Sequence, residues 1–318
     1  MKARHLFQKL AITGGAGFIG SNLAEALAEE NEVVVLDDLS TGKLGNLAGI
    51  KAKLVKGSIT DLELLKRTFE DVDCVFHLAA VASVQKSVED PIRTNQVNIY
   101  GTLNVLLAAR DAGVKRVVFA SSSAVYGDDP QLPKREDMMP KPCSPYAVAK
   151  LAGEQYSKVF EELYGLEATS LRFFNVFGPK QDPSSEYSGV ISRFIAAALN
   201  GRKPTIFGDG EQTRDFVYVA DVVRALILAE SSSKTGIFNV ARGENVSLNR
   251  LLRMIARDAG IEAAARYGPP RPGDIMHSLA DITKAQAIGY SPRWSIEEGL
   301  RETVRWFGAK RSRAGIRL

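Results

Sequence analysis

The chain has 318 residues, of which 45% are hydrophobic and 25% charged, a composition typical of a globular protein with a substantial core. Its formal net charge of +4 comes from the basic tail Gly308–Leu318, because acidic and basic residues balance in the rest of the chain. That balance argues against a nucleic-acid-binding protein, in which Lys and Arg gather on one face or along one helix.

Short apolar runs alternate with helical patterns through the first half of the chain. The runs expected as strands are Leu10–Thr13, Val33–Leu36, Lys53–Lys56, Cys74–Leu78, Arg116–Ala120 and Glu167–Arg172. The helices expected among them are Gly17–Glu29, one that begins at Asp61, Asn95–Ala112 and Pro145–Tyr164. Apolar strands that alternate with helices predict a parallel sheet covered on both faces. We therefore predict an α/β fold with a doubly wound parallel-sheet Rossmann domain.

The second half of the chain is less regular. Helical patterns cover Ser188–Asn200, Val219–Ala229, Ser247–Ala259 and Ile296–Phe307. We expect a domain boundary near Gly178, which divides a Rossmann domain of residues 1–178 from a smaller α/β substrate-binding domain of residues 179–318. Segments after residue 218 can return to the first domain. The basic tail is expected to be a solvated, frayed end.

Several other functional classes are disfavoured by the sequence. No apolar run approaches the roughly 18 residues of a membrane-spanning helix, and the basic start Met1–Lys9 lacks the apolar stretch of a secretory signal. We therefore expect a cytoplasmic protein without a membrane partner. Cys74 and Cys143 are too few for a disulfide framework, and we expect them in the core and in a loop, respectively. No His or Cys cluster has the spacing of metal ligands, so no metal is expected.

A glycine-rich turn follows the first strand and opens the first helix. Residues 13–20 read Thr-Gly-Gly-Ala-Gly-Phe-Ile-Gly, in which glycines allow a tight turn and let amides approach a pyrophosphate. Asp37 ends the second strand, where a carboxylate can bind the ribose hydroxyls of NAD and repel the 2′-phosphate of NADP. The pattern therefore predicts NAD as the cofactor. His77, which ends the fourth strand, is expected to form structural hydrogen bonds.

Tyr146 and Lys150 form a Tyr-x-x-x-Lys motif in a predicted helix. Residues four apart lie on one helical face, so the ammonium of Lys150 can reach the phenol of Tyr146. A free tyrosine has a pKa near 10, but a neighbouring cation favours the phenolate. Tyr146 is therefore a candidate general base.

These motifs make the chain resemble the extended short-chain dehydrogenase/reductases, and within them the nucleotide-sugar 4-epimerases of the UDP-galactose 4-epimerase type. The resemblance extends from Leu10 to Trp306. Its further markers are His-Leu-Ala-Ala, Asn98 in Asn-Ile-Tyr-Gly-Thr, Ser-Ser-Ser-Ala-Val-Tyr-Gly, Ser-Pro-Tyr-Ala-Val-Ala-Lys, Leu-Arg-Phe-Phe-Asn-Val-Phe-Gly-Pro and Arg-Asp-Phe-Val-Tyr-Val-Ala-Asp.

The resemblance implies a Ser-Tyr-Lys catalytic site made of Ser122, Tyr146 and Lys150. Tyr146 would take the proton of the sugar 4-hydroxyl while hydride passes from C4 to NAD, and the 4-keto sugar would turn and recover the hydride on its other face. Which serine of residues 121–123 acts in catalysis stays open. The cofactor-binding residues that the resemblance implies are Gly14, Gly17, Phe18, Ile19, Gly20, Asp37, Asp38, Ser40, Gly42, Ser58, Ile59, Leu78, Ala79, Ala80, Asn98, Ser122, Tyr146, Lys150 and Phe174.

The resemblance also implies a UDP-hexose as the substrate. Ser278 occupies the position that limits the substituent on sugar C2, and its small side chain leaves space for an N-acetyl group. UDP-GlcNAc and UDP-GalNAc are therefore expected beside UDP-Glc and UDP-Gal, with the physiological sugar left open. The substrate-binding residues implied are Ser83, Ser122, Ser123, Tyr146, Asn175, Phe207, Arg214, Phe216, Arg271, Asp274 and Ser278.

Two other functions stay open at this point. The related dehydratases and decarboxylases carry acidic residues after the catalytic position, where this chain has Ser123 and Ala124. A non-catalytic NAD-binding regulator is the third alternative. The resemblance also implies a homodimer, formed through the helices Asn95–Ala112 and Pro145–Tyr164.

Overall fold

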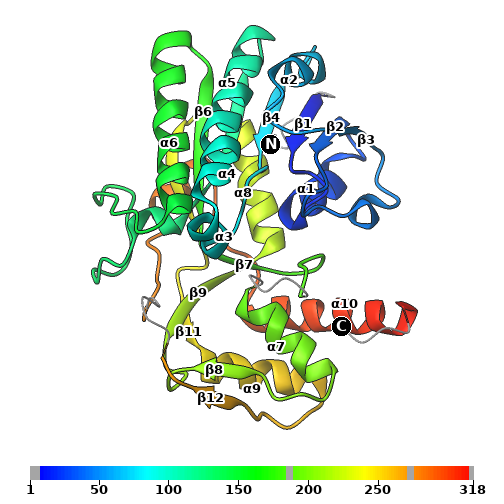
Figure 1. The fold of residues 1–318 in the computed structure, drawn as a ribbon, viewed down its shortest axis with the longest axis vertical. Helices are drawn as coiled ribbons and strands as arrows, with labels where there is room; N and C mark the ends of the chain where they lie inside the picture. Colours follow the sequence, from blue (N-terminus) through cyan, green and yellow to red (C-terminus); the bar gives the residue numbers. More distant parts are fainter. Residues whose placement is uncertain (1–7, 184–188, 271–275, 315–318) are drawn as a thin grey trace.

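The computed structural model describes residues 8–183, 189–270 and 276–314. The chain forms two lobes, the larger of which is organised around a seven-stranded parallel sheet (Figure 1). The strand order is β10-β6-β5-β4-β1-β2-β3. The strands are β1 (Lys9–Thr13), β2 (Glu32–Asp37), β3 (Ala52–Lys56), β4 (Cys74–His77), β5 (Arg116–Ser122), β6 (Glu167–Phe173) and β10 (Gly236–Val240).

Alternate side chains along the strands point to opposite faces of this sheet, and each face packs into its own hydrophobic core. Leu10 and Ile12 of β1 pack with α1 (Phe18–Leu27) and α8 (Val219–Ser231). Ala11, between them, belongs to the other core, which includes side chains of α2 (Leu62–Thr68), α5 (Gly101–Asp111) and α6 (Pro145–Tyr164). The predicted α/β class and doubly wound sheet are confirmed, and Cys74 is buried in the core as expected.

The helix predicted over Asn95–Ala112 is wrong at its start. Helix α3 (Val84–Glu89) leads into α4 (Pro91–Asn95), a π-helical turn covers Gln96–Tyr100 and α5 follows directly. Asp90 accepts a hydrogen bond from the Arg93 amide, and Pro91 occupies the first turn, so the local sequence caps an earlier helix start. In contrast, α6 has the predicted bounds, from the Ser144 cap to the left-handed Gly165.

The described part of the smaller lobe carries two short sheets and three α-helices. Strands β11 (Asn245–Ser247), β9 (Thr213–Tyr218) and β7 (Asn175–Phe177) form one sheet, and β12 (Arg266–Gly268) pairs with β8 (Thr205–Phe207). The helices are α7 (Val190–Leu199), α9 (Leu248–Ala259) and α10 (Ile296–Ala314). After β9 the chain crosses back to the larger lobe, where α8 covers the sheet and β10 pairs with β6 (Figure 1).

The expectation of a frayed basic tail is wrong for its first part. Helix α10 continues through Gly308 to Ala314, and the Lys310 ammonium lies 4.9 Å from the centre of the Trp306 ring. Among the described residues, no helix combines the length and apolar character needed to cross a membrane. Within the same ranges, no group of three or more His, Cys, Asp or Glu side chains could hold a metal ion.

Candidate active site

A cavity of about 770 Å³ opens at the carboxyl ends of the parallel strands. Its wall includes the turn after β1 and the loops after β2, β3 and β4, the edge at which open α/β sheets bind ligands. The structure brings eighteen of the residues predicted for cofactor, substrate or catalysis into this one wall, namely Gly14, Gly17, Phe18, Ile19, Gly20, Asp37, Asp38, Ser40, Ser58, Ile59, Leu78, Ala79, Ala80, Ser83, Ser122, Tyr146, Lys150 and Phe174.

The glycine turn leaves no room for side chains. Gly14 has φ +72°, and a Cβ there would lie 2.7 Å from the Ala79 nitrogen. A Cβ at Gly20 would lie 2.3 Å from the Gly14 oxygen. No side chain caps the N-terminus of α1, and its first turn holds no acidic residue, so its amides are accessible to an anion. This turn fits the pyrophosphate of a dinucleotide.

Asp37 is anchored beside the glycine turn. Its carboxylate accepts hydrogen bonds from the amides of Ala16 (2.9 Å) and Leu39 (2.8 Å). Burial raises the pKa of Asp37, while these two hydrogen bonds oppose the shift. Gly42 lies outside the described cavity wall but packs on the carboxylate, since a Cβ there would lie 2.7 Å from Asp37 Oδ1. Asp37 also lines the cavity, at the strand end where the ribose of a dinucleotide would bind.

His77 and Asn98 support the wall from behind. The His77 ring nitrogens lie 2.8 Å from Thr13 Oγ1 and 2.9 Å from Thr102 Oγ1. Burial lowers the pKa of His77 to about 3, so the ring is neutral and its role is structural. Asn98, in the π-helical turn, pairs with both backbone groups of Val81 at 2.7 and 3.1 Å rather than entering the described wall.

Tyr146 and Lys150 project from the first turns of α6. Ser144 caps this helix by accepting a hydrogen bond from the Ala147 amide at 3.2 Å. Lys150 Nζ donates to the carbonyl oxygen of Ala120 at 2.7 Å and lies 5.8 Å from the centre of the Tyr146 ring. Burial lowers the pKa of Lys150 to about 8 and raises that of Tyr146. Lys150 therefore stays mainly protonated at neutral pH, as a partner for a phenolate must.

The three serines at the end of β5 have different surroundings. Ser122 lines the cavity, and its hydrogen bond to Tyr146 lowers the pKa of that phenol. Ser121 also reaches the wall, but its hydroxyl donates to Glu154. Ser123 begins a 3-10 turn and is not among the residues of the described wall. This geometry favours Ser122 as the catalytic serine, an assignment that stays a prediction.

The described residues predicted to bind the UDP group do not meet in one cavity wall, in contrast to the predicted cofactor residues. Phe207 lines a second cavity of about 470 Å³, while Phe216 is 3% exposed and packs edge-on against Phe177 in the core. Asn175 donates to the carbonyl oxygen of Asp215 at 3.2 Å. Arg214 donates to the carbonyl oxygen of Thr213 at 3.0 Å.

Three further predicted substrate residues lie near the end of the chain. Ser278 is half-buried and donates its amide to the Thr213 carbonyl oxygen at 3.1 Å. It lies in neither described cavity wall. Arg271 and Asp274 fall outside the described residues.

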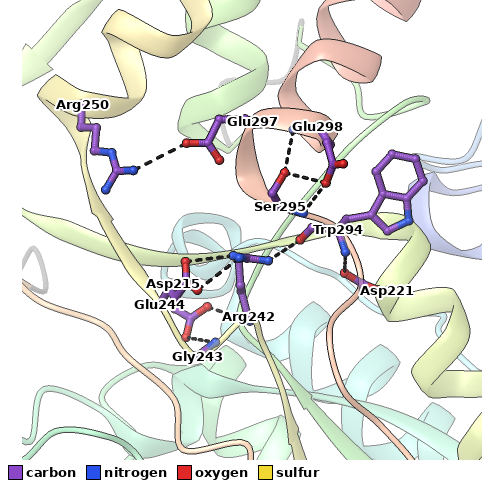
Figure 2. A network of polar contacts seen from close by, with 10 residues as sticks. All are labelled: Asp215, Asp221, Arg242, Gly243, Glu244, Arg250, Trp294, Ser295, Glu297 and Glu298. Carbon is purple, nitrogen blue, oxygen red and sulfur yellow. Dashed lines mark hydrogen bonds and ion pairs between the residues drawn. The ribbon is translucent and has the colours of Figure 1, made fainter.

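The sequence analysis did not identify Asp215, whose side chain connects several segments of the smaller lobe. The buried carboxylate of Asp215 accepts hydrogen bonds from the amides of Arg242 (2.9 Å), Gly243 (3.0 Å) and Ala280 (3.1 Å). Figure 2 shows Asp215 beside Arg242, which also contacts Glu244 and the backbone of Trp294. Burial raises the pKa of Asp215 to about 7. Its carboxylate thus joins three chain segments, including the one that carries Ser278.

Comparison with known proteins identifies the family of this chain. Residues 10–241 match the model of the NAD dependent epimerase/dehydratase family. A UDP-glucose 4-epimerase of Mycolicibacterium smegmatis is 42% identical over 308 residues, which cover 94% of this chain and 98% of that protein.

Two solved structures share the fold closely. A UDP-N-acetylglucosamine 4-epimerase from Methanobrevibacter ruminantium, in complex with UDP-N-acetylmuramic acid, is 45% identical with a TM-score of 0.93 and covers 96% of this chain and 99% of that one. A Thermus thermophilus UDP-glucose 4-epimerase in complex with NAD is 40% identical with a TM-score of 0.88, and the match covers 97% of this chain and 100% of that one. The chain therefore belongs to the NAD-dependent epimerase/dehydratase family.

Proposed function

We propose that this protein is an isomerase that interconverts UDP-hexoses at sugar C4 with NAD as a resident cofactor. The observation that carries the proposal is the meeting of Ser122, Tyr146 and Lys150 with the glycine turn and Asp37 in one cavity wall. The related UDP-glucose and UDP-N-acetylglucosamine 4-epimerases support the same reaction.

The catalytic side chains act on the proton of the sugar 4-hydroxyl. Tyr146 accepts this proton as the C–H bond at C4 breaks, and Ser122 hydrogen-bonds the 4-oxygen. Lys150, whose pKa is about 8, supplies a positive charge that favours the phenolate. NAD, when bound, supplies a hydride acceptor and donor, so no net oxidation occurs. The 4-keto sugar must turn within the cavity before C4 recovers its hydrogen from the other side.

The substrate range is proposed to include both plain and N-acetylated hexoses. Ser278 is small, and a small residue at this position leaves volume beside sugar C2. The relatives act on UDP-glucose in one case and on UDP-N-acetylglucosamine in another. We infer that Phe207, Arg214 and Asn175 contact the UDP group, with Arg271 and Asp274 as the further contacts that the family resemblance implies.

Dehydration and decarboxylation require an additional acid or base beside the reacting carbons. The two positions after Ser122 hold Ser123 and Ala124, which supply no carboxylate for that proton transfer. Epimerisation needs only the Ser122, Tyr146 and Lys150 set. A purely regulatory NAD-binding role leaves the contact between Ser122 and Tyr146 without a purpose.

A panel of UDP-hexoses, incubated with the protein without added reductant, tests the proposal. We expect UDP-Glc and UDP-GlcNAc to give their C4 epimers with unchanged mass, and Tyr146→Phe to slow the conversion by about 1,000-fold. A product lighter by water would identify a dehydratase instead, and loss of carbon dioxide from UDP-glucuronic acid, added to the panel for this purpose, would identify a decarboxylase. No turnover of any sugar by NAD-loaded protein would favour the regulator.

We further propose a homodimer that works in the cytoplasm. Apolar side chains are exposed along α6 and the π-helical turn, including Leu163 (68%) and Tyr100 (53%). A helix-to-helix contact between two copies would cover them. Sedimentation equilibrium should give twice the chain mass, and Leu163→Glu with Tyr100→Glu should give the monomer. A wild-type monomer at micromolar concentration would contradict this assembly.

A further inference from the structure

A buried ion pair lies directly behind the catalytic face of α6. Tyr146, Lys150 and Glu154 are four residues apart in this helix and therefore share one face. Arg172, on β6, donates to both carboxylate oxygens of Glu154, through Nε at 2.8 Å and Nη2 at 2.7 Å. The Arg172 side chain is 2% exposed and that of Glu154 is 0% exposed, so both charges are withdrawn from water.

Stability alone does not account for this pair. Removing two charges from water costs about as much as their attraction returns, and apolar residues of similar volume often stabilise a core at least as well. A bidentate pair does, however, fix the relative position of two elements more narrowly than apolar packing does. Here the two elements are the catalytic helix and a strand next to the one that ends in Ser122.

The pair also fixes the chain on both sides of Ser122. The Ser121 hydroxyl donates to Glu154 Oε1, which holds the residue that precedes Ser122. The Arg172 guanidinium lies 4.7 Å from the centre of the Tyr126 ring, and Tyr126 ends the 3-10 turn that follows Ser122. One ion pair therefore contacts the chain at the residue before Ser122 and at Tyr126, four residues after it.

The same network reaches the smaller lobe. Tyr126 Oη donates to Asn239 Oδ1 at 2.7 Å. Asn239 Nδ2 in turn donates to the carbonyl oxygens of Lys134 (2.9 Å) and Asp281 (3.0 Å). Asp281 lies three residues beyond Ser278, so one set of contacts runs from the catalytic helix to the segment expected to meet the sugar.

Glu154 also sets the electrostatic surroundings of Lys150. The carboxylate of Glu154 raises the pKa of Lys150 against the lowering effect of burial. The other titratable groups near Lys150 are the phenol of Tyr146 on the same helix, the neutral His77 on β4 and, beyond Glu154, the Arg172 guanidinium. Among these side chains, Glu154 is the one whose negative charge favours the protonated form of Lys150.

We propose that Glu154 and Arg172 are positioning residues for C4 epimerisation, which hold the Ser122 hydroxyl against Tyr146 and keep the Lys150 ammonium beside them. The inference rests on the proposed function, and neither residue touches the reacting atoms. Their effect should therefore be on kcat and its pH dependence rather than on cofactor or substrate binding.

The test replaces the whole pair by Glu154→Met with Arg172→Met, so that no unpaired charge stays buried. We expect NAD affinity and KM within about threefold of wild type, but kcat lower by about tenfold or more, because small misplacements of reacting groups cost up to about 100-fold. We also expect the alkaline limb of the kcat profile to move to lower pH, since Lys150 loses its anion. Unchanged kcat and pH profile would overturn the proposal.

The chain supplies a matched control at the opposite end of the same two strands. Arg116 on β5 pairs with Glu167 on β6 at their amino ends, far along the sheet from Ser122. Arg116→Met with Glu167→Met should leave kcat and its pH profile unchanged. An equal fall in kcat in both double variants would mean general damage to the sheet and would also overturn the proposal.

A second measurement covers the case in which the double variant does not fold. Ser121→Ala removes the contact between Glu154 and the strand end while the ion pair stays in place, and we expect kcat to fall several-fold with KM retained; full activity would count against the proposal. In a folded double variant, the phenolate absorbance of Tyr146, taken as the difference from the matching protein with Tyr146→Phe, should titrate at higher pH than in wild type. This readout needs no turnover, so it separates failure of this inference from failure of the epimerase assignment.

Discussion

The two cavities described above are built in different ways. Around the larger one the main chain itself forms much of the wall, because Gly14 and Gly20 bring backbone atoms to the surface and Asp37 is held by amides. Around the smaller one the wall comes from separate segments, including Phe207 and Met276. A backbone-built site is encoded by a short continuous motif, whereas a site assembled from distant segments depends on how the lobe packs.

The largest effect is expected when the larger cavity loses one catalytic hydroxyl group but keeps its shape. Tyr146→Phe should lower kcat by about 1,000-fold, since general acid–base catalysis contributes about 100- to 10,000-fold. Steady-state assays with UDP-Glc measure the loss, and equilibrium titration should show unaltered NAD binding. A variant that lost both activity and NAD would mean that the phenol also builds the cofactor site.

Specificity should respond to a single side chain contributed by the smaller lobe. Ser278→Tyr should lower kcat/KM for UDP-GlcNAc by about 100-fold because the added ring fills the space for the N-acetyl group. Activity on UDP-Glc should stay near wild type, and Ser278→Ala should retain both substrates. An equal loss on both sugars would contradict the volume argument.

A steric change in the glycine turn should weaken the cofactor site as a whole. Gly20→Val should lower NAD affinity by about 10- to 100-fold, because overpacking of about 1–3 kcal/mol displaces the turn. The Cβ would lie 2.3 Å from the Gly14 oxygen. Isothermal titration measures the effect, and Gly45→Ala, with no atom within 4 Å of its Cβ, is the neutral control. Wild-type affinity in Gly20→Val would refute the close packing.

The smallest effect is expected at the carboxylate that ties the smaller lobe together. Asp215→Asn should lower the free energy of unfolding by about 1–3 kcal/mol at pH 5, because an amide NH₂ would face backbone donors. Its pKa rises from 3.8 to about 7 on folding, so its contribution is full below pH 3.8 and declines up to about pH 7.

Urea unfolding of wild type and Asp215→Asn across this range measures the contribution of the Asp215 carboxyl. The stability difference between the two proteins should shrink as pH rises. A difference that stayed constant from pH 4 to pH 8 would show that the three amide donors keep the carboxylate ionised throughout.

Local signals explain which parts could be predicted. The six strands from β1 to β6 are apolar runs bounded by polar residues, and α6 has a Ser144 cap and a Gly165 end, so both appear in the sequence. The three-residue strands β7, β8 and β11 are too short to show a period. Their pairing depends on contacts between distant segments, which no short motif encodes.

The same reasoning applies to the site. The glycine turn and the Tyr146–Lys150 spacing are visible because each lies within one segment. Glu154 and Arg172 look like ordinary surface charges in sequence, and only the register of α6 on β6 reveals them as buried partners. Helix α3 was not predicted, although the sequence contains a helix-start signal there: Ser83 caps the helix by accepting a hydrogen bond from the Lys86 amide. The division at residue 178 stays a prediction.

The return of β10 to the main sheet has a consequence for biosynthesis. The carboxyl-proximal strand β10 covers the open edge of β6, and α8 covers one face of the sheet, yet both are translated after β7 and β9 of the other lobe. The nucleotide-binding lobe therefore cannot complete itself on the ribosome until Val240 has left the exit tunnel. Until then the nascent chain exposes an unpaired strand edge, the kind of surface that chaperones shield.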